Sequence, residues 1–325
     1  MHFEHFGLKQ NPFLLDTAAH CVFYGSSQRG AMAHLLYGMR ESRGIVLLLG
    51  EPGTGKTTLL RSALAALDPA LMTPCVLFNP MVETVQDLLY NVLAGFKVNV
   101  GHRPAMELLA ALQTFLESQA AREFRPVLVV DEAQHLDIRM LENLRLISNL
   151  ESDGRRLLQL VLSAQPELGE RLANPRLQAL CQRIVARYRL QNLQPAEVWP
   201  YLALRVARAG GDGRSIFQPS AVSLLAAYSR RVPRLLNVLA DHCLIAAFAQ
   251  GDSEVGPEVV RVVARHLELT ADDSQATAPA GADRDSASTW RALVEEYRDY
   301  KMPETLLRFA GSLRSQPAVG SALPA

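Results

Sequence analysis

From Gln28 to Leu190, short runs of mostly apolar residues alternate with longer segments whose apolar residues recur at the spacing of a helix. The runs are short and rich in valine, leucine and isoleucine, which is typical of strands buried on both faces of a parallel sheet. The predicted strands cover residues 45–49, 75–78, 127–130, 157–162 and 186–190. The predicted helices cover residues 28–40, 58–67, 84–93, 104–122 and 138–150. Strands that alternate with helices predict an α/β fold with helices on both faces of the sheet.

The pattern changes after Asn192, where only helices are predicted. They cover residues 196–209, 219–229, 233–249 and 257–267, and prolines near several starts are tolerated in a first helical turn. Small polar residues follow, and then an amphipathic stretch that is interrupted at Pro303. We therefore expect an α/β domain at 1–192, an all-α domain at 193–269, a disordered linker at 270–289, and a short amphipathic helix with a flexible tail at 290–325.

The residues between the first strand and its helix follow the pattern G-x-x-x-x-G-K-T, the P-loop. Glycines allow backbone conformations that let loop N–H groups converge on phosphate oxygens, and the next helix adds partial positive charge. Lys56 would bind the β- and γ-phosphates of ATP, and the Thr57 hydroxyl would bind Mg²⁺. The expected nucleotide-binding residues are Gly50, Glu51, Pro52, Gly53, Thr54, Gly55, Lys56, Thr57 and Thr58.

Two adjacent carboxylates, Asp131 and Glu132, follow the apolar strand at 127–130. Parallel sheets bind ligands at the carboxyl ends of their strands, which is where these acids lie. We expect Asp131 to hold Mg²⁺ and Glu132 to polarise the attacking water. Acids at a helix N-terminus would give the same local pattern, but the P-loop upstream favours the catalytic interpretation.

Composition limits the remaining choices. Lys+Arg and Asp+Glu both total 33, so the net charge of +0 gives no bulk electrostatic reason for binding nucleic acid or a membrane. The 4 cysteines are scattered and form no C-x-x-C pair, which fits a reducing cytosol. The chain shows no signal peptide and no apolar run of membrane-spanning length. We expect a cytoplasmic protein, not inserted in the membrane, that reaches the inner membrane only through a partner.

Several motifs together resemble the ExeA-type general secretion pathway ATPases of the AAA+ class. They are Gly50–Thr57, Asp131-Glu132-Ala133-Gln134, Leu150-Glu151, Gln165-Pro166-Glu167-Leu168 and Pro233-Arg234-Leu235-Leu236-Asn237, and the similarity covers about residues 1–268. ATPases of pilus, polysaccharide-export and exosortase loci are related, and Mu B-type transposition regulators share much of the pattern. The resemblance implies a five-stranded parallel sheet, with the acid-bearing strand next to the P-loop strand, followed by a helical lid. It also implies Mg²⁺-dependent ATP hydrolysis by a homo-oligomer.

The resemblance assigns roles to further residues. Asn79 ends the second strand, where such ATPases often carry a polar residue that restrains the catalytic Glu. Gln165 falls in the sensor-1 region and either reads the γ-phosphate or makes a local turn bond. Arg183 lies where the arginine finger of a neighbouring subunit is expected, although Arg187 and Arg189 are close competitors.

Arg234 resembles sensor 2, which reaches from the lid back to the nucleotide. Many relatives carry Gly-Gly-x-Pro-Arg there, whereas this chain has arginines at 230 and 231, which should stiffen the turn.

Two segments and the cellular process are left with alternatives. The aromatic N-terminal arm either packs on the core or covers the adenine, and Trp290 to Leu313 either docks on a partner or folds back on its own core. The process is either assembly or regulation of an envelope secretion, export or pilus system with a membrane-associated partner, or DNA-bound regulation of transposition or target selection. The absence of a basic tail disfavours DNA, while Arg155-Arg156 and Arg230-Arg231 keep it open.

Overall fold

The computed structural model describes residues 2–14, 22–41, 44–78, 80, 82–101, 103–211, 213–271, 286–298 and 300–306. The chain forms two compact units. The sheet unit comprises Arg29–Pro52, Leu59–Leu190 and Pro303–Ala325. The lid unit comprises Met1–Gln28, Gly53–Thr58 and Gln191–Met302. Most of the P-loop is therefore grouped with the lid helices.

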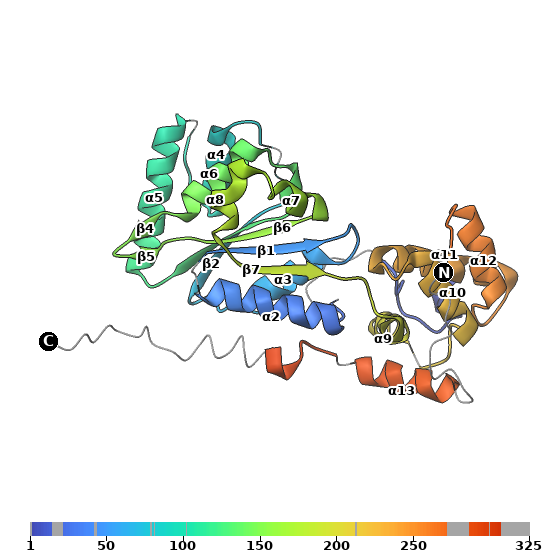
Figure 1. The fold of residues 1–325 in the computed structure, drawn as a ribbon. Coiled ribbons are helices and arrows are strands. Elements are labelled where there is room, and N and C mark those ends of the chain that lie inside the picture. The colour runs from blue at the N-terminus through green and yellow to red at the C-terminus, as the bar shows by residue number, and fades with distance from the viewer. Residues whose placement is uncertain are drawn as a thin grey trace. The chain divides into compact units, whose positions relative to one another are not determined.

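The sheet unit is built on five parallel strands in the order β2-β3-β6-β1-β7 (Figure 1). Their bounds are β1 (Ile45–Gly50), β2 (Met72–Leu77), β3 (Arg125–Val130), β6 (Gln159–Ala164) and β7 (Ile184–Leu190). Every residue of β1 and β6 is buried, as in a strand covered on both faces. The predicted α/β fold with a five-stranded parallel sheet is confirmed.

The expected strand order was wrong in one respect. β6 lies between β3 and β1, so the acid-bearing strand is not next to the P-loop strand. The pairing aligns Leu160 of β6 with Leu128 on one side and Ile45 on the other. Strands that are apolar on both faces pair equally well in several orders, so the pattern along the chain does not specify which strand lies in the middle.

Helices cover both faces of this sheet (Figure 1). On one face the core includes residues of α4 (Val85–Gly95), α5 (Ala105–Ala121), α6 (Ile138–Ser148), α7 (Pro166–Arg171) and α8 (Gln178–Cys181). The other face carries α2 (Ser26–Glu41) and α3 (Lys56–Ala65). The backbone of α2 approaches β1 closely, since a Cβ added to Gly38 would lie 2.1 Å from Val46 Cγ2. Because alternate residues of a strand point to opposite faces, strands that are apolar throughout, such as β1, make both faces of the sheet apolar.

Helix caps follow the sequence, whereas short elements were not predicted. The Thr84 side chain accepts from Asp87 N and the Asp87 side chain accepts from Thr84 N, a capping box that begins α4. A small antiparallel hairpin of β4 (Glu151–Ser152) and β5 (Arg155–Arg156) lies between α6 and β6. Between β6 and β7 the chain forms α7, the 3₁₀ turn η3 (Pro175–Leu177) and α8.

The lid unit has its own core. Its helices are α1 (His2–His5), η4 (Pro195–Glu197), α9 (Val198–Arg208), α10 (Pro219–Ser229), α11 (Pro233–Gln250), α12 (Pro257–His266) and α13 (Ser286–Arg298). Phe6, Leu8 and Phe13 of the N-terminal arm are buried in this core, so the arm packs with the lid helices. The sequence had assigned these residues to a domain at 1–192, because nothing local shows which core an aromatic segment will join.

The C-terminal helix α13 also belongs to the lid core. It begins at Ser286, ahead of the expected start at Trp290, and Trp290 and Val294 are fully buried. The indole N–H of Trp290 donates to Arg214 O at 2.8 Å, and its ring packs edge-on against Trp199. The sequence left open whether this segment docks on a partner or folds back on its own core, and the structure shows that α13 folds back. Residues 272–285 and 307–325 lie outside the described part, so the linker and the flexible tail remain predictions.

Candidate functional site

The P-loop has the backbone that its sequence predicts. β1 ends at Gly50 and α3 begins at Lys56, with Gly53 at φ 80° and Gly55 at φ 96° between them. Such positive φ angles are strained for residues with a Cβ. A Cβ added to Gly55 would meet nothing within 4 Å, so the loop is open there, and Lys56 is only 5% exposed. An open glycine turn at a helix N-terminus that begins with a lysine fits a bound triphosphate.

The predicted sensor-2 residue lies against this loop. Arg234 N, in the first turn of α11, donates to Gly53 O at 3.2 Å. A Cβ added to Gly53 would lie 2.8 Å from Arg234 Cβ and 3.1 Å from Val232 Cγ1. The start of α11 and the P-loop backbone are therefore in direct contact, and the Arg234 side chain is exposed beside the loop.

The turn before Arg234 keeps a glycine-like backbone although it contains no glycine. Arg230 and Arg231 have φ angles of 50° and 58°. Three hydrogen bonds support this strained turn: Arg231 N to Ser229 Oγ at 3.2 Å, Arg231 Nε to Leu193 O at 3.0 Å, and Asn192 Nδ2 to Arg230 O at 3.2 Å. Both arginines therefore hold a left-handed backbone that glycine would adopt without strain.

The two predicted carboxylates leave β3 at the carboxyl edge of the sheet. Asp131 is only 2% exposed, and its backbone N donates to Leu77 O at 2.9 Å. Glu132 has a left-handed backbone, φ 55° and ψ 38°, and its N–H donates to Asp131 Oδ1 at 3.0 Å. A non-glycine residue in this conformation is uncommon, and strained residues of this kind are concentrated at functional sites. We call residues Asp131–Leu136 the acid turn.

Two glutamines bind the Glu132 carboxylate. Gln134 Nε2 donates to Glu132 Oε2 at 2.5 Å, and Gln165 Nε2 donates to the same oxygen at 3.3 Å. Gln165 N in turn donates to Gln134 Oε1 at 3.0 Å. The structure thus places the Gln165 side chain at the predicted catalytic base, and because Glu132 is 33 residues away in the sequence, this contact is not a local turn bond. In the sequence Gln134 is only one member of a motif, and no local signal shows that its side chain reaches the residue after β6.

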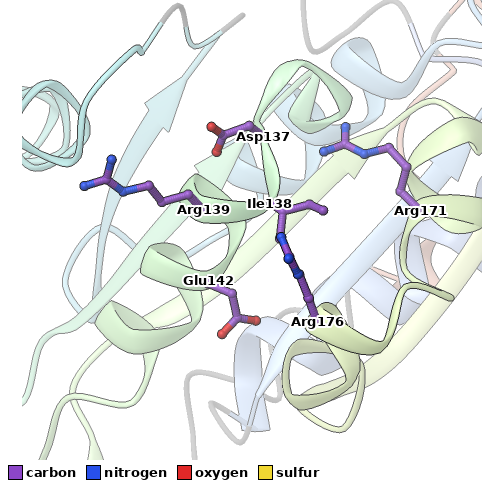
Figure 2. Close-up of a pocket in the computed structure, with 6 residues that line it drawn as sticks. All are labelled: Asp137, Ile138, Arg139, Glu142, Arg171 and Arg176. Carbon is purple, nitrogen blue, oxygen red and sulfur yellow. The ribbon is translucent and has the colours of Figure 1, made fainter.

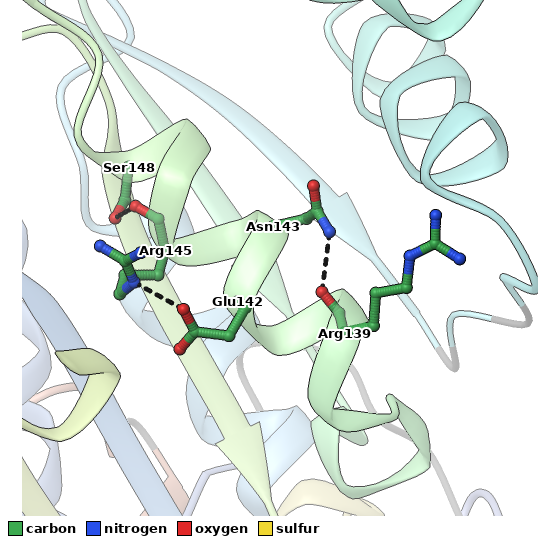
Figure 3. Close-up of polar contacts among 5 residues, drawn as sticks. All are labelled: Arg139, Glu142, Asn143, Arg145 and Ser148. Carbon is green, nitrogen blue, oxygen red and sulfur yellow. Dashed lines mark hydrogen bonds and ion pairs between the residues drawn. The ribbon is translucent and has the colours of Figure 1, made fainter. Parts of the chain in front are cut away.

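Arg171 of α7 holds the backbone of the acid turn through two hydrogen bonds. Its Nη1 donates to Gln134 O at 2.7 Å and its Nη2 to Leu136 O at 2.6 Å. Arg171 also lines an open cavity of about 580 Å³, and Figure 2 draws the residues that line it. The other lining residues are Asp137, Ile138, Arg139, Glu142 and Arg176. Charge around the cavity is partly balanced, since Glu142 pairs with Arg145 at 2.9 Å on the next helical turn (Figure 3).

The three candidate finger residues occupy different places. Arg183 O accepts from Ile45 N at 2.8 Å, so Arg183 lies at the amino end of β1 and β7. Gly50 ends the same strand, about 16 Å away at the usual rise per residue, which is beyond the reach of an arginine side chain. Arg189 instead pairs with Glu51 of its own chain at 3.3 Å, and Arg187 Nη2 lies beside Gly169.

Two further expectations concern residues or groups that are not described. Asn79 lies outside the described residues, so its role remains a prediction. Among the residues that the structure describes, no three His, Cys, Asp or Glu side chains are grouped to hold a metal ion by themselves. Magnesium commonly takes one or two protein oxygens and completes its shell with phosphate and water. Thr57 and Asp131 would fit this mode of binding.

Comparison with known proteins gives the class. Residues 39–172 match the AAA domain family. This part of the chain is an AAA+ domain. It is also 40% identical over 256 residues to the general secretion pathway protein A of Aeromonas hydrophila, which confirms the resemblance. This match covers 78% of the chain but 46% of that protein, so the AAA+ chain spans less than half the length of the relative.

Solved AAA+ structures share the fold at low sequence identity. Cdc6p from Pyrobaculum aerophilum aligns with a TM-score of 0.61 and 15% identity, covering 93% of this chain and 88% of that one. The Aeropyrum pernix ORC2 protein aligns with a TM-score of 0.55 and 14% identity, covering 88% and 92%. No helix within the described ranges of the present chain is both long and apolar enough to cross a bilayer.

Proposed function

We propose that this AAA+ protein binds and hydrolyses ATP with Mg²⁺, and that hydrolysis drives the assembly or regulation of a bacterial envelope secretion, export or pilus system. One observation carries the enzymatic part. β1 and β3 are parallel and separated by β6, so Gly50 and the acid turn leave the same edge of the sheet. At usual strand spacing the two strands are about 10 Å apart, which suits a triphosphate held at one and attacked by water held at the other.

Each residue has a defined task in this proposal. The loop N–H groups and Lys56 would bind the phosphates, and Thr57 and Asp131 would hold Mg²⁺. The metal ion, when bound, neutralises charge on the phosphate oxygens. Glu132 would orient a water molecule in line with the γ-phosphate and accept its proton. Gln165, which already contacts the Glu132 carboxylate, would keep the base directed at that water.

The finger would come from a second copy of the chain. Arg183 is at the opposite edge of the sheet from Gly50, so it cannot reach its own P-loop. In a homo-oligomer it would instead stabilise charge on the γ-phosphate bound by a neighbour. Activity would therefore rise when subunits assemble.

The cellular process is inferred from the relative. The similarity to a general secretion pathway protein supports a cytoplasmic ATPase that acts through a membrane-associated secretion or export component. The alternative, a DNA-bound ATPase in transposition, is supported by the arginines at 155 and 156 on the β4–β5 hairpin, of which Arg155 is exposed. Duplex DNA binding with a steep salt dependence would favour that alternative. Its absence at low salt would remove it.

The enzymatic proposal is tested with two variants of the full chain. Glu132→Gln should bind Mg²⁺–ATP and fail to turn it over, with a loss of about 100-fold or more in kcat. Lys56→Ala should lose binding itself, measured with a fluorescent ATP analogue. Glu170→Gln, on the exposed side of α7, is the charge-matched control and should behave like the wild type. Normal turnover by Glu132→Gln would show that another group is the base.

A further inference from the structure

Neighbouring residues restrain the orientation of the Glu132 carboxylate. Its side chain starts from a strained backbone, and two amides donate to one of its oxygens. A carboxylate that accepts two fixed donors keeps both its plane and its position. Gln134 differs from Gln165 in that the far end of its amide is also held, because its Oε1 accepts from Gln165 N at 3.0 Å. Gln134 is therefore a fixed donor to the predicted base.

The orientation of the Gln134 amide follows from its two neighbours. Its nitrogen faces a carboxylate oxygen and its oxygen faces the backbone N–H of Gln165. The flipped amide would set oxygen against carboxylate and N–H against N–H, so only one assignment is consistent. One side chain thus joins the end of β3 to the end of β6. Because Gln134 and Gln165 are 31 residues apart, the link connects two segments that the chain itself does not hold together.

Arg171 fixes the position from which Gln134 acts. Its two terminal nitrogens donate to the carbonyls of Gln134, within the 3₁₀ turn η2 (Ala133–His135), and of Leu136, the residue that ends the turn. A planar guanidinium that spans two acceptors defines their spacing more tightly than an ammonium group could. The support is therefore a chain of contacts from α7 through the acid turn to the carboxylate.

We infer that Gln134 is a positioning residue for Glu132, and that Arg171 acts behind it by holding the acid turn. The inference rests on the proposed ATPase function. In this arrangement the Gln134 N–H holds the carboxylate where it can receive a proton from water, and the Gln134 carbonyl oxygen ties that geometry to the end of β6. A carboxylate displaced by about 1 Å loses much of its effect as a base.

Two substitutions distinguish the contribution of the Gln134 N–H, which contacts Glu132, from that of its Oε1, which contacts Gln165 N. Gln134→Ala removes both contacts, so kcat should fall about tenfold while the Kd of a non-hydrolysable ATP analogue stays within about twofold. Gln134→Glu keeps an acceptor for Gln165 N but sets a second carboxylate against Glu132. Its kcat should fall at least as far, because like charges repel.

A second readout does not depend on turnover. The Gln165 amide proton is bound by Gln134 Oε1. In the nucleotide-free protein, hydrogen exchange of that amide should become faster in Gln134→Ala and stay slow in Gln134→Glu. A purely structural role would instead lower nucleotide affinity and loosen the turn in both variants, with kcat following them.

Arg171→Lys tests the support, and Arg176→Lys is its matched control. Both arginines line the cavity of Figure 2, but in the structure only Arg171 contacts carbonyls of the acid turn. Arg171→Lys should lower kcat about threefold, since one ammonium group cannot span both carbonyls. Arg176→Lys should leave kcat unchanged.

The possible results separate this inference from the function on which it rests. Wild-type protein without Mg²⁺-dependent ATPase activity would overturn the proposed function. An active wild type with an inactive Glu132→Gln, but with normal or raised kcat in Gln134→Ala or Gln134→Glu, would overturn the positioning role alone.

Discussion

Replacing Trp290 by alanine should destabilise the lid unit strongly, although the residue follows the linker predicted at 270–289. Trp290 is 0% exposed. Its ring centroid lies 5.6 Å from that of Trp199 and 6.2 Å from that of Phe217, and its N–H donates to Arg214 O. α13 therefore completes the lid core.

The magnitude follows from these contacts. Truncation of a buried tryptophan to alanine costs about 3–5 kcal/mol in unfolding free energy. The substitution also breaks two edge-to-face ring pairs and leaves the Arg214 carbonyl without its donor, so we expect about 4–5 kcal/mol. Trp290→Phe keeps an aromatic ring but loses the N–H, and about 2 kcal/mol is expected. Glu295→Ala, on the exposed side of α13, should change stability by less than about 0.5 kcal/mol.

Urea unfolding followed by tryptophan fluorescence measures this directly. The chain has 2 tryptophans, Trp199 and Trp290, and both lie in the lid core. The fluorescence signal therefore reports on unfolding of the lid unit alone. In Trp290→Ala the remaining Trp199 serves as the probe. If Trp290→Ala and Glu295→Ala unfold at the same urea concentration, α13 is not packed in solution, and the docking-peptide interpretation returns.

Two further predictions concern the oligomer and pH. Mixing Arg183→Ala with Lys56→Ala subunits should restore ATPase activity, because roughly a quarter of randomly formed interfaces combine an intact finger with an intact loop; no recovery at any ratio would contradict a finger in trans. Burial raises the pKa of the Cys75 thiol from 9.0 to about 12, so the folded state keeps a proton that the unfolded chain releases. This contribution to stability is complete below about pH 9 and is lost as the pH rises towards 12. Cys75 lies in the sheet unit, so unfolding is followed here by far-UV circular dichroism and not by tryptophan fluorescence. Cys75→Ala should flatten the fall in urea midpoint over that range; an unchanged slope would contradict the assignment.

Much of the fold could be predicted because long elements carry their own signals. Examples are the apolar runs at β1 and β3 and the Thr84 cap of α4. Each depends only on residues close together in the sequence, so it can be recognised without the folded structure. β4 and β5 span two residues each, too short for any periodic pattern. The order of the strands depends on how apolar faces stack, which several arrangements satisfy equally.

The candidate site divides in the same way. Lys56, Asp131 and Glu132 could be predicted because each follows a buried strand or begins a helix within a recognisable motif. The role of Gln134 could not be, because it depends on contacts with Gln165 and Arg171, residues brought close only by the folded sheet. The left-handed backbone of Glu132 was equally hidden, since glutamate has no particular preference for it.

The phosphate motif does not require glycine at position 53, but the positive φ of that residue and the neighbouring helix α11 both do. The pattern G-x-x-x-x-G-K-T accepts any residue there, yet a single methyl group would collide with Arg234. Two separate constraints thus meet in one short loop: the motif requires glycine at 50 and 55, and α11 excludes a side chain at 53. We expect a homologue with a bulkier residue at this position to differ in the backbone of the loop, in the start of the helix that corresponds to α11, or in both.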